Sequence, residues 1–213
     1  MSQAVISAWI DQRTADPHKY GLNRYPDFLR LDMVQALAAR HGLQATNYAP
    51  LAGSGEVGSV LAAALLRVRG AELIQSWPID DPISSAARAW GATVRRVALN
   101  RAHGQDLDAI ASRAGPQTRL VHLQNPHDPG GQTFGQAELE AFLATVAERA
   151  PEAYVWIDET HARYAARADF PDCFALIGRD TEGSRLAVSR TLGGAAGMSG
   201  VQVAFLTASR ALA

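Results

Sequence analysis

Residues 186–205 read LAVSRTLGGAAGMSGVQVAF, and this stretch decides the fold. Its pattern predicts a strand over 186–189, a loop of small residues, and a second strand over 201–206. Glycine accepts positive φ and lets the backbone approach another group closely, so the loop is typical of a turn beside a binding site. No Gly-Lys-Ser/Thr sequence ends the loop, which excludes a nucleotide-binding P-loop of the usual pattern.

Three stretches precede this loop in a fixed order: 52–56 (AGSGE), 125–130 (NPHDPG) and 156–161 (WIDETH). The first opens an expected helix, and the other two lie at the ends of expected apolar strands. Together with the loop and with 23–27 (NRYPD), they resemble the large domain of fold type I pyridoxal-phosphate aminotransferases. The histidinol-phosphate aminotransferase branch is the nearest, and the resemblance covers nearly the whole chain from about Tyr20.

The order of elements predicts an α/β fold, with three layers and a mostly parallel sheet covered by helices on both faces. We expect an N-terminal helix and arm over 1–30 and an aminotransferase-like large domain over 31–213. The family carries a second, smaller domain after this point, which the chain is expected to lack. The expected strands are 72–77, 93–99, 119–124, 154–158, 186–189 and 201–206, and the main expected helices are 29–41, 55–68, 81–90, 107–114 and 137–150.

The sequence departs from the family at the cofactor-binding positions. The family's serine and its Schiff-base lysine align with Gly193 and Gly194, and its phosphate-binding arginine aligns with Gln202. The aromatic residue that covers the cofactor ring aligns with Asp80, beside Trp77. We therefore expect no covalently bound pyridoxal phosphate, and a weak non-covalent ligand at most.

The candidate site residues lie at strand ends, where ligands of parallel sheets bind. The resemblance implies that Asp158 pairs with the cofactor's ring nitrogen and that Asn125, in a cis Asn-Pro pair, binds the ring oxygen. Each could instead stabilise only a local turn. Ser54 and Gly55 at a helix start would suit an anion, although Ser54 could simply be the N-cap.

His161 stands where the family has a tyrosine. An imidazole can donate and accept protons near neutral pH, so His161 is a candidate acid/base with Asp158 beside it. The alternative is a structural histidine.

These observations leave three functional hypotheses open. The first is a degenerate aminotransferase-like enzyme that acts on a small amino-acid-like or phosphorylated metabolite without lysine-bound cofactor. The second is a non-catalytic homologue that binds a ligand or a partner protein. The third is an ordinary transaminase whose Schiff-base lysine is Lys19, the only lysine in the chain.

Composition excludes several other classes of protein. The net charge is −1 with interspersed signs, so no nucleic-acid-binding patch is expected. Cys173 is the only cysteine, which fits a reducing, cytoplasmic location. Neither a zinc motif nor a membrane-spanning apolar run is present. The aromatic residues of the N-terminal arm (Tyr20, Tyr25 and Phe28) favour a homodimer that places the arm against its partner.

Overall fold

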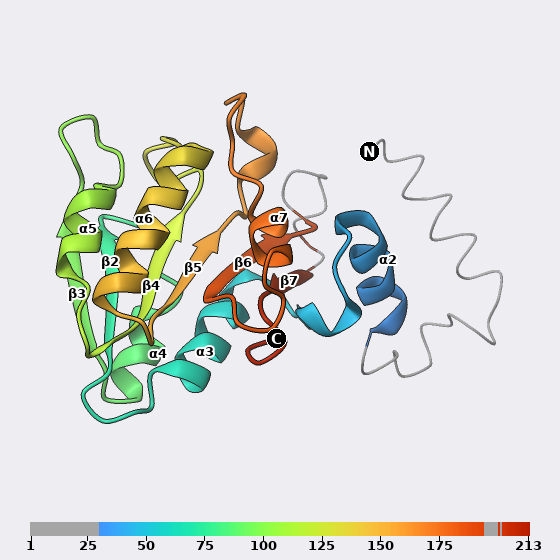
Figure 1. Ribbon diagram of the computed structural model, residues 1–213, viewed down its shortest axis with the longest axis horizontal. Helices are drawn as coiled ribbons and strands as arrows, with labels where there is room; N and C mark the ends of the chain where they lie inside the picture. Colours follow the sequence, from blue (N-terminus) through green and yellow to red (C-terminus); the bar gives the residue numbers. More distant parts are fainter. Residues whose placement is uncertain (1–29, 194–199, 201) are drawn as a thin grey trace.

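The computed structural model describes residues 30–193, 200 and 202–213, and their framework is a seven-stranded sheet (Figure 1). The strand order is β1-β7-β6-β5-β4-β2-β3. Neighbouring strands pair in parallel, except that β7 runs antiparallel to both β6 and β1. The strands are β1 (Tyr48–Leu51), β2 (Glu72–Trp77), β3 (Thr93–Ala98), β4 (Thr118–Gln124), β5 (Tyr154–Asp158), β6 (Leu186–Thr191) and β7 (Ala204–Thr207).

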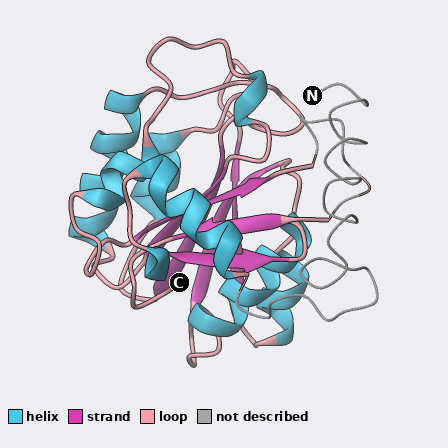
Figure 2. Ribbon diagram, turned by 90° about the vertical axis from the view of Figure 1, so that its right-hand side faces the viewer, coloured by secondary structure: helices cyan, strands magenta, loops and turns pink. Residues whose placement is uncertain are grey.

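Helices cover both faces of the sheet, as Figure 2 shows. One apolar core joins α2, α5, α6 and α7 to one face, and a second joins α3 and α4 to the other. Successive residues of a strand point to opposite faces: Leu73 lies in the second core and Ile74 in the first. The described α-helices are α2 (Leu31–His41), α3 (Ser54–Leu65), α4 (Ser84–Ala89), α5 (Leu107–Arg113), α6 (Gln136–Arg149) and α7 (Cys173–Gly178).

This arrangement confirms the predicted three-layer α/β fold with a mostly parallel sheet. The central strands β4 and β5 are buried along nearly their whole length, as expected where helices cover both faces. Asp106 caps α5, because its side chain accepts a hydrogen bond from Ala109 N. Among the described helices, none is long and apolar enough to cross a membrane.

Several predicted boundaries differ from the structure. Gly53, not Ser54, is the N-cap residue of α3. The helix expected from residue 81 begins at Ser84, because Asp81 accepts a hydrogen bond from Ser84 N and caps the turn instead. The last strand begins at Ala204 rather than at residue 201. Two short elements, β1 and α7, were not predicted at all.

Some predictions lie outside the described residues. They include the expected N-terminal helix, the aromatic residues of the arm and the loop position Gly194. Within the described part, the carboxyl ends of β4, β5 and β6 lie side by side, since Gln124 pairs with Asp158 and Asp158 with Ser189. The loops that leave this edge form the candidate site.

Candidate functional site

Asp158, the last residue of β5, is a buried carboxylate with only 5% of its surface exposed. Its Oδ1 accepts hydrogen bonds from Thr160 N (2.9 Å), Thr160 Oγ1 (2.6 Å) and Ser189 Oγ (3.2 Å). Burial raises the pKa of Asp158, and these hydrogen bonds partly oppose that rise. Among the described residues, no arginine forms an ion pair with it. A buried carboxylate without such a partner suits a cationic group on a ligand.

Asn125 is fully buried, and its side chain closes the loop after β4. Its amide Nδ2 donates to the carbonyl of Phe134, and its Oδ1 accepts from the backbone N–H of Phe134, both at 3.2 Å. Its own backbone N–H donates to the carbonyl of Asp158. The Asn125–Pro126 peptide is cis, as expected. Asn125 thus joins the two loops of the site, with its polar side-chain atoms bonded to Phe134.

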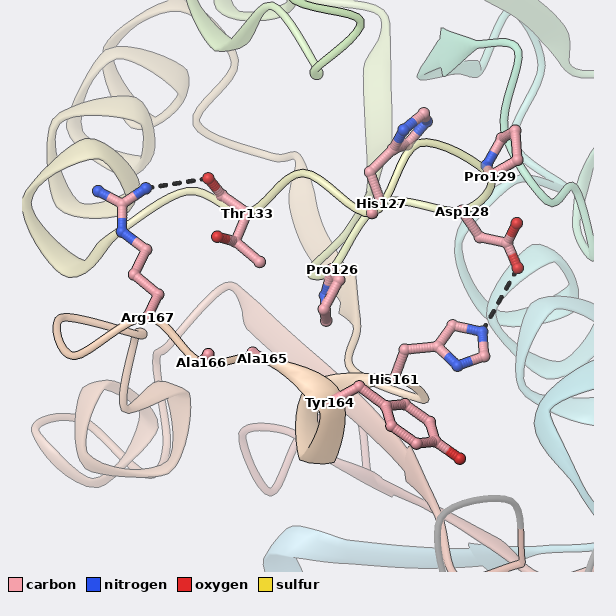
Figure 3. A pocket seen from close by; sticks show the side chains of 11 residues that line it. Pro126, His127, Asp128, Pro129, Thr133, His161, Tyr164, Ala165, Ala166 and Arg167 are labelled. Carbon is pink, nitrogen blue, oxygen red and sulfur yellow. Dashed lines mark hydrogen bonds and ion pairs between the residues drawn. The ribbon is translucent and has the colours of Figure 1, made fainter.

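His161 and Asp128 face each other from the loops that follow β5 and β4. His161 Nε2 lies 3.4 Å from Asp128 Oδ2, and the two side chains are 44% and 42% exposed. Both line a pocket of about 600 Å³, shown in Figure 3. The other residues that line it are Pro126, His127, Pro129, Gly131, Thr133, Tyr164, Ala165, Ala166 and Arg167.

The opposite wall of this pocket is held by Arg167. Its guanidinium donates to the carbonyl of Thr133 and pairs with Asp169 and Glu138. Because these groups already engage its donors, Arg167 supports the wall instead of presenting a free cation to a ligand; Figure 3 shows its contact with Thr133.

The amino end of α3 brings together three residues predicted for the site. Ser54 and Gly55 form the first turn of this 12-residue helix. Gln202, far away in sequence, packs against Gly53, the residue just before this turn. A Cβ on Gly53 would lie 2.5 Å from Gln202 Oε1. Free N–H groups and the helix dipole favour an anion at such a position. Glu56 adds a carboxylate to the same turn and accepts a hydrogen bond from Ala52 N.

Trp77 and Asp80 lie on the loop that follows β2. The Trp77 ring is 42% exposed, and the guanidinium of Arg96 stacks over it at 3.6 Å from the ring centroid. The backbone of Asp80 is fixed beside the pocket, because its N–H donates to the carbonyl of Asp128 and its carbonyl accepts from Gln124. The structure therefore brings Asp80 close to Asp128, while Gly194 lies outside the described residues.

Sequence reasoning did not single out Asp128, Thr160 or Ser189. Asp128 lies within the quoted stretch 125–130, three residues after Asn125. Both are polar and both precede a proline, so spacing alone could not show which one faces the pocket. Ser189 ends the predicted strand 186–189, and its register opposite Asp158 was the available signal.

Comparisons with known proteins place this chain in a family. Residues 2–213 match the family model described as aminotransferase class I and II. An aromatic amino acid aminotransferase of Rhodococcus jostii (strain RHA1) is 32% identical over 190 residues, which cover 89% of this chain and 51% of that protein. Histidinol-phosphate aminotransferase 2 of Pseudomonas aeruginosa is 33% identical over 192 residues, which cover 90% and 50%. This chain thus spans about half the length of these curated relatives.

A solved structure shares the fold. Histidinol-phosphate aminotransferase from Sinorhizobium meliloti, in complex with pyridoxal-5'-phosphate, superposes with a TM-score of 0.82 at 20% identity. The match covers 99% of this chain and 54% of that one.

These findings correct the expectation about the cofactor. We expected no covalently bound pyridoxal phosphate and a weak ligand at most, but the aminotransferase relatives and the solved complex point to pyridoxal phosphate as the cofactor. The expectation relied on the altered anchor positions and gave too little weight to Asp158, a buried carboxylate that suits a protonated ring nitrogen. The amino end of α3 likewise fits a phosphate. The chain therefore belongs to the aminotransferase class I and II family.

Proposed function

We propose that this chain is the pyridoxal-phosphate-binding domain of an aminotransferase that takes the amino group from an aromatic amino acid or from histidinol phosphate. The observation that carries the proposal is Asp158, a buried carboxylate at the carboxyl edge of the sheet with no arginine paired to it in the described part of the chain. The substrate class comes from the names of the relatives, which are aromatic amino acid and histidinol-phosphate aminotransferases.

Asp158 would bind the cofactor's ring nitrogen. When bound, the cofactor serves as an electron sink for the carbon that carries the amino group, provided that the ring nitrogen stays protonated. The negative charge of Asp158 stabilises that proton. Thr160 and Ser189 fix the carboxylate by donating to a single oxygen, Oδ1.

Ser54, Gly55 and Gln202 would bind the phosphate. The first turn of α3 offers backbone N–H groups, and Gln202 lies against the residue that begins the helix. An amide can donate a hydrogen bond to a phosphate but supplies no charge, so this contact is weaker than one from arginine.

The amine that would bind the cofactor covalently is a separate question. Lys19 is the only lysine of the chain, and it is our candidate for that amine. A second candidate function is a non-catalytic homologue that binds the cofactor or a partner protein. Gly194, at the position where the family has its lysine, favours that alternative.

An equilibrium titration with pyridoxal phosphate tests the proposal. Asp158→Asn keeps the acceptors for Thr160 and Ser189 but removes the charge. Since hydrogen bonds to charged groups contribute roughly 1.5–3 kcal/mol, the Kd should rise about 10- to 100-fold. Glu152→Gln is the matched control, because Glu152 is an exposed carboxylate just before the opposite end of β5. It should leave the Kd unchanged.

Two outcomes would reject the proposal: wild-type protein that shows no saturable binding, or Asp158→Asn that binds as tightly as the Glu152→Gln control. In the same samples, borohydride reduction and peptide mass analysis show whether Lys19 carries the cofactor. Amino-group transfer is then assayed with L-phenylalanine and with L-histidinol phosphate as donors. Cofactor binding without transfer from either donor would favour the non-catalytic homologue.

A further inference from the structure

Asp128 and His161 form a carboxylate–imidazole pair across two loops of the site. Asp128 belongs to the loop after β4, and His161 to the loop after β5. Their side chains approach to 3.4 Å between Oδ2 and Nε2, and both line the pocket of about 600 Å³ (Figure 3). A histidine beside an orienting carboxylate, where both side chains line an open pocket, is an arrangement that can move protons.

The backbone on both sides of the pair is fixed. The N–H of Asp128 donates to Gln124 Oε1, and its carbonyl accepts from Asp80 N, both at 3.1 Å. The carbonyl of His161 accepts from Tyr164 N at 2.9 Å, which closes a short 3₁₀ turn over Ala162–Tyr164. These bonds hold the two main chains from which the side chains of the pair extend.

Two other charged groups act near the pair. Arg167, on the far wall, is paired with Asp169 and Glu138. Asp158 also acts electrostatically on His161, but Thr160 and Ser189 occupy its Oδ1. Among the described residues, His161 is the one side chain recorded in an ion-pair contact with the Asp128 carboxylate.

We propose that Asp128 positions His161, and that His161 accepts and returns a substrate proton at Nδ1. This inference rests on the proposed function and adds the groups that move the proton. With Nε2 directed at the Asp128 carboxylate, the neutral ring keeps its proton on Nε2, which leaves Nδ1 as the nitrogen with a lone pair. The carboxylate thus decides which ring nitrogen is the base.

The proton that leaves the substrate returns to it within the site. When a C–H bond of the bound amino acid breaks, its electron pair stays on the ligand and its proton passes to Nδ1. The imidazolium that forms has N–H groups on both nitrogens, and the negative charge of Asp128 stabilises it. His161 then returns the proton to the ligand and ends neutral, so no further reactant is needed.

Nitrogen NMR tests the pair without any cofactor. In ¹⁵N-labelled protein, His161 should show the Nε2–H tautomer at a pH where the ring is neutral, and His161→Asn identifies its signals among those of the six histidines. Asp128→Asn keeps an acceptor and should keep this tautomer. Asp128→Ala removes the acceptor and should give averaged tautomers. A wild-type Nδ1–H tautomer, or signals unchanged in Asp128→Ala, would overturn the pair.

Hydrogen exchange tests the proton transfer. With saturating pyridoxal phosphate and L-phenylalanine in D₂O, His161→Asn should slow exchange of the α-hydrogen about 100-fold, since a positioned acid/base typically contributes 10²–10⁴. Asp128→Ala should slow it at least tenfold with less than threefold change in cofactor Kd, and Asp128→Asn should slow it to a smaller extent. Glu152→Gln should match wild type. Wild-type exchange rates in both Asp128 variants would overturn the positioning role.

The two proposals fail separately. If the wild-type protein does not bind pyridoxal phosphate, the proposed function fails, while the tautomer of His161 still decides whether Asp128 holds the ring. If the cofactor binds and responds to Asp158→Asn, but Asp128→Ala changes neither tautomer nor exchange, the proposed function stands and the role of Asp128 is rejected.

Discussion

At the scale of single residues, the buried side chain of His122 makes the stability of the core depend on pH. It is fully buried and stacks on Trp156 with ring centroids 4.2 Å apart. Its Nδ1 contacts Gln75 Oε1 at 3.4 Å, and its Nε2 has no hydrogen-bond partner in the described structure. Burial lowers the pKa of His122 to about 3. The folded protein therefore keeps His122 neutral at pH values where the unfolded chain, whose histidine has an ordinary pKa of about 6.5, binds a proton.

His122 should consequently make the protein less stable as the pH falls from about 6.5 toward 3. Between pH 7 and pH 5 we expect it to cost about 2 kcal/mol in the free energy of unfolding. The raised pKa values of Asp158 and Glu159 make the folded protein more stable as the pH falls, which opposes the effect of His122. The test therefore compares the wild-type protein with a His122 variant. His122→Phe keeps the stacked ring without a titrating group, and urea unfolding should show a smaller loss between the two pH values. Equal losses in both proteins would refute the role of His122.

The sequence predicted one of the pocket's polar residues correctly and could not predict the orientation of others. The motif around Asp158 placed a carboxylate at a strand end correctly, since Asp158 ends β5 as predicted. No pattern could show that the Asn125 side chain bonds Phe134 while Asp128 faces the pocket. That choice depends on how two loops fold against each other, which the spacing of polar residues does not encode.

At the scale of elements, the amino end of α3 depends on a glycine. Gly53 has φ 108° and ψ 168°, a region that is essentially open to glycine alone. A Cβ there would also approach Gln202 Oε1 to 2.5 Å. The sequence predicted the helix but placed its cap at Ser54, because a preference for serine at N-caps cannot reveal a positive φ one residue earlier. β1 and α7 were missed because one contains Pro50 and the other has only six residues.

Gly53→Ala tests this element against a matched glycine. Gly42 caps α2 at φ 69°, but a Cβ there would meet nothing within 4 Å. Both substitutions should lower the free energy of unfolding by about 1–3 kcal/mol through backbone strain. Only Gly53→Ala should also displace Gln202 and weaken the binding of pyridoxal phosphate in the titration. Equal cofactor affinity in the two variants would separate Gln202 from the phosphate site.

At the scale of the whole molecule, the alternation of strands and helices predicted the parallel sheet, but it did not predict the order of the strands. β1 pairs with β7 across most of the chain, and β3 forms the far edge. Such long-range pairings depend on which faces the helices bury, so they emerge only when the elements pack together.

Assembly is the remaining prediction at this scale. We expect a homodimer, because the arm that carries the aromatic residues Tyr20, Tyr25 and Phe28 resembles the arm that the family places against its partner subunit. Light scattering at micromolar concentration should give twice the 22.7 kDa mass of the chain. Serine at all three arm positions should shift the protein toward monomer.

Trp90→Ser is the control: Trp90 is 48% exposed, but it precedes β3 and so lies at the amino ends of the strands, away from the site. A monomeric wild type would contradict the dimer directly. A dimer that survives the arm substitutions and dissociates with Trp90→Ser would place the interface at the opposite edge of the sheet.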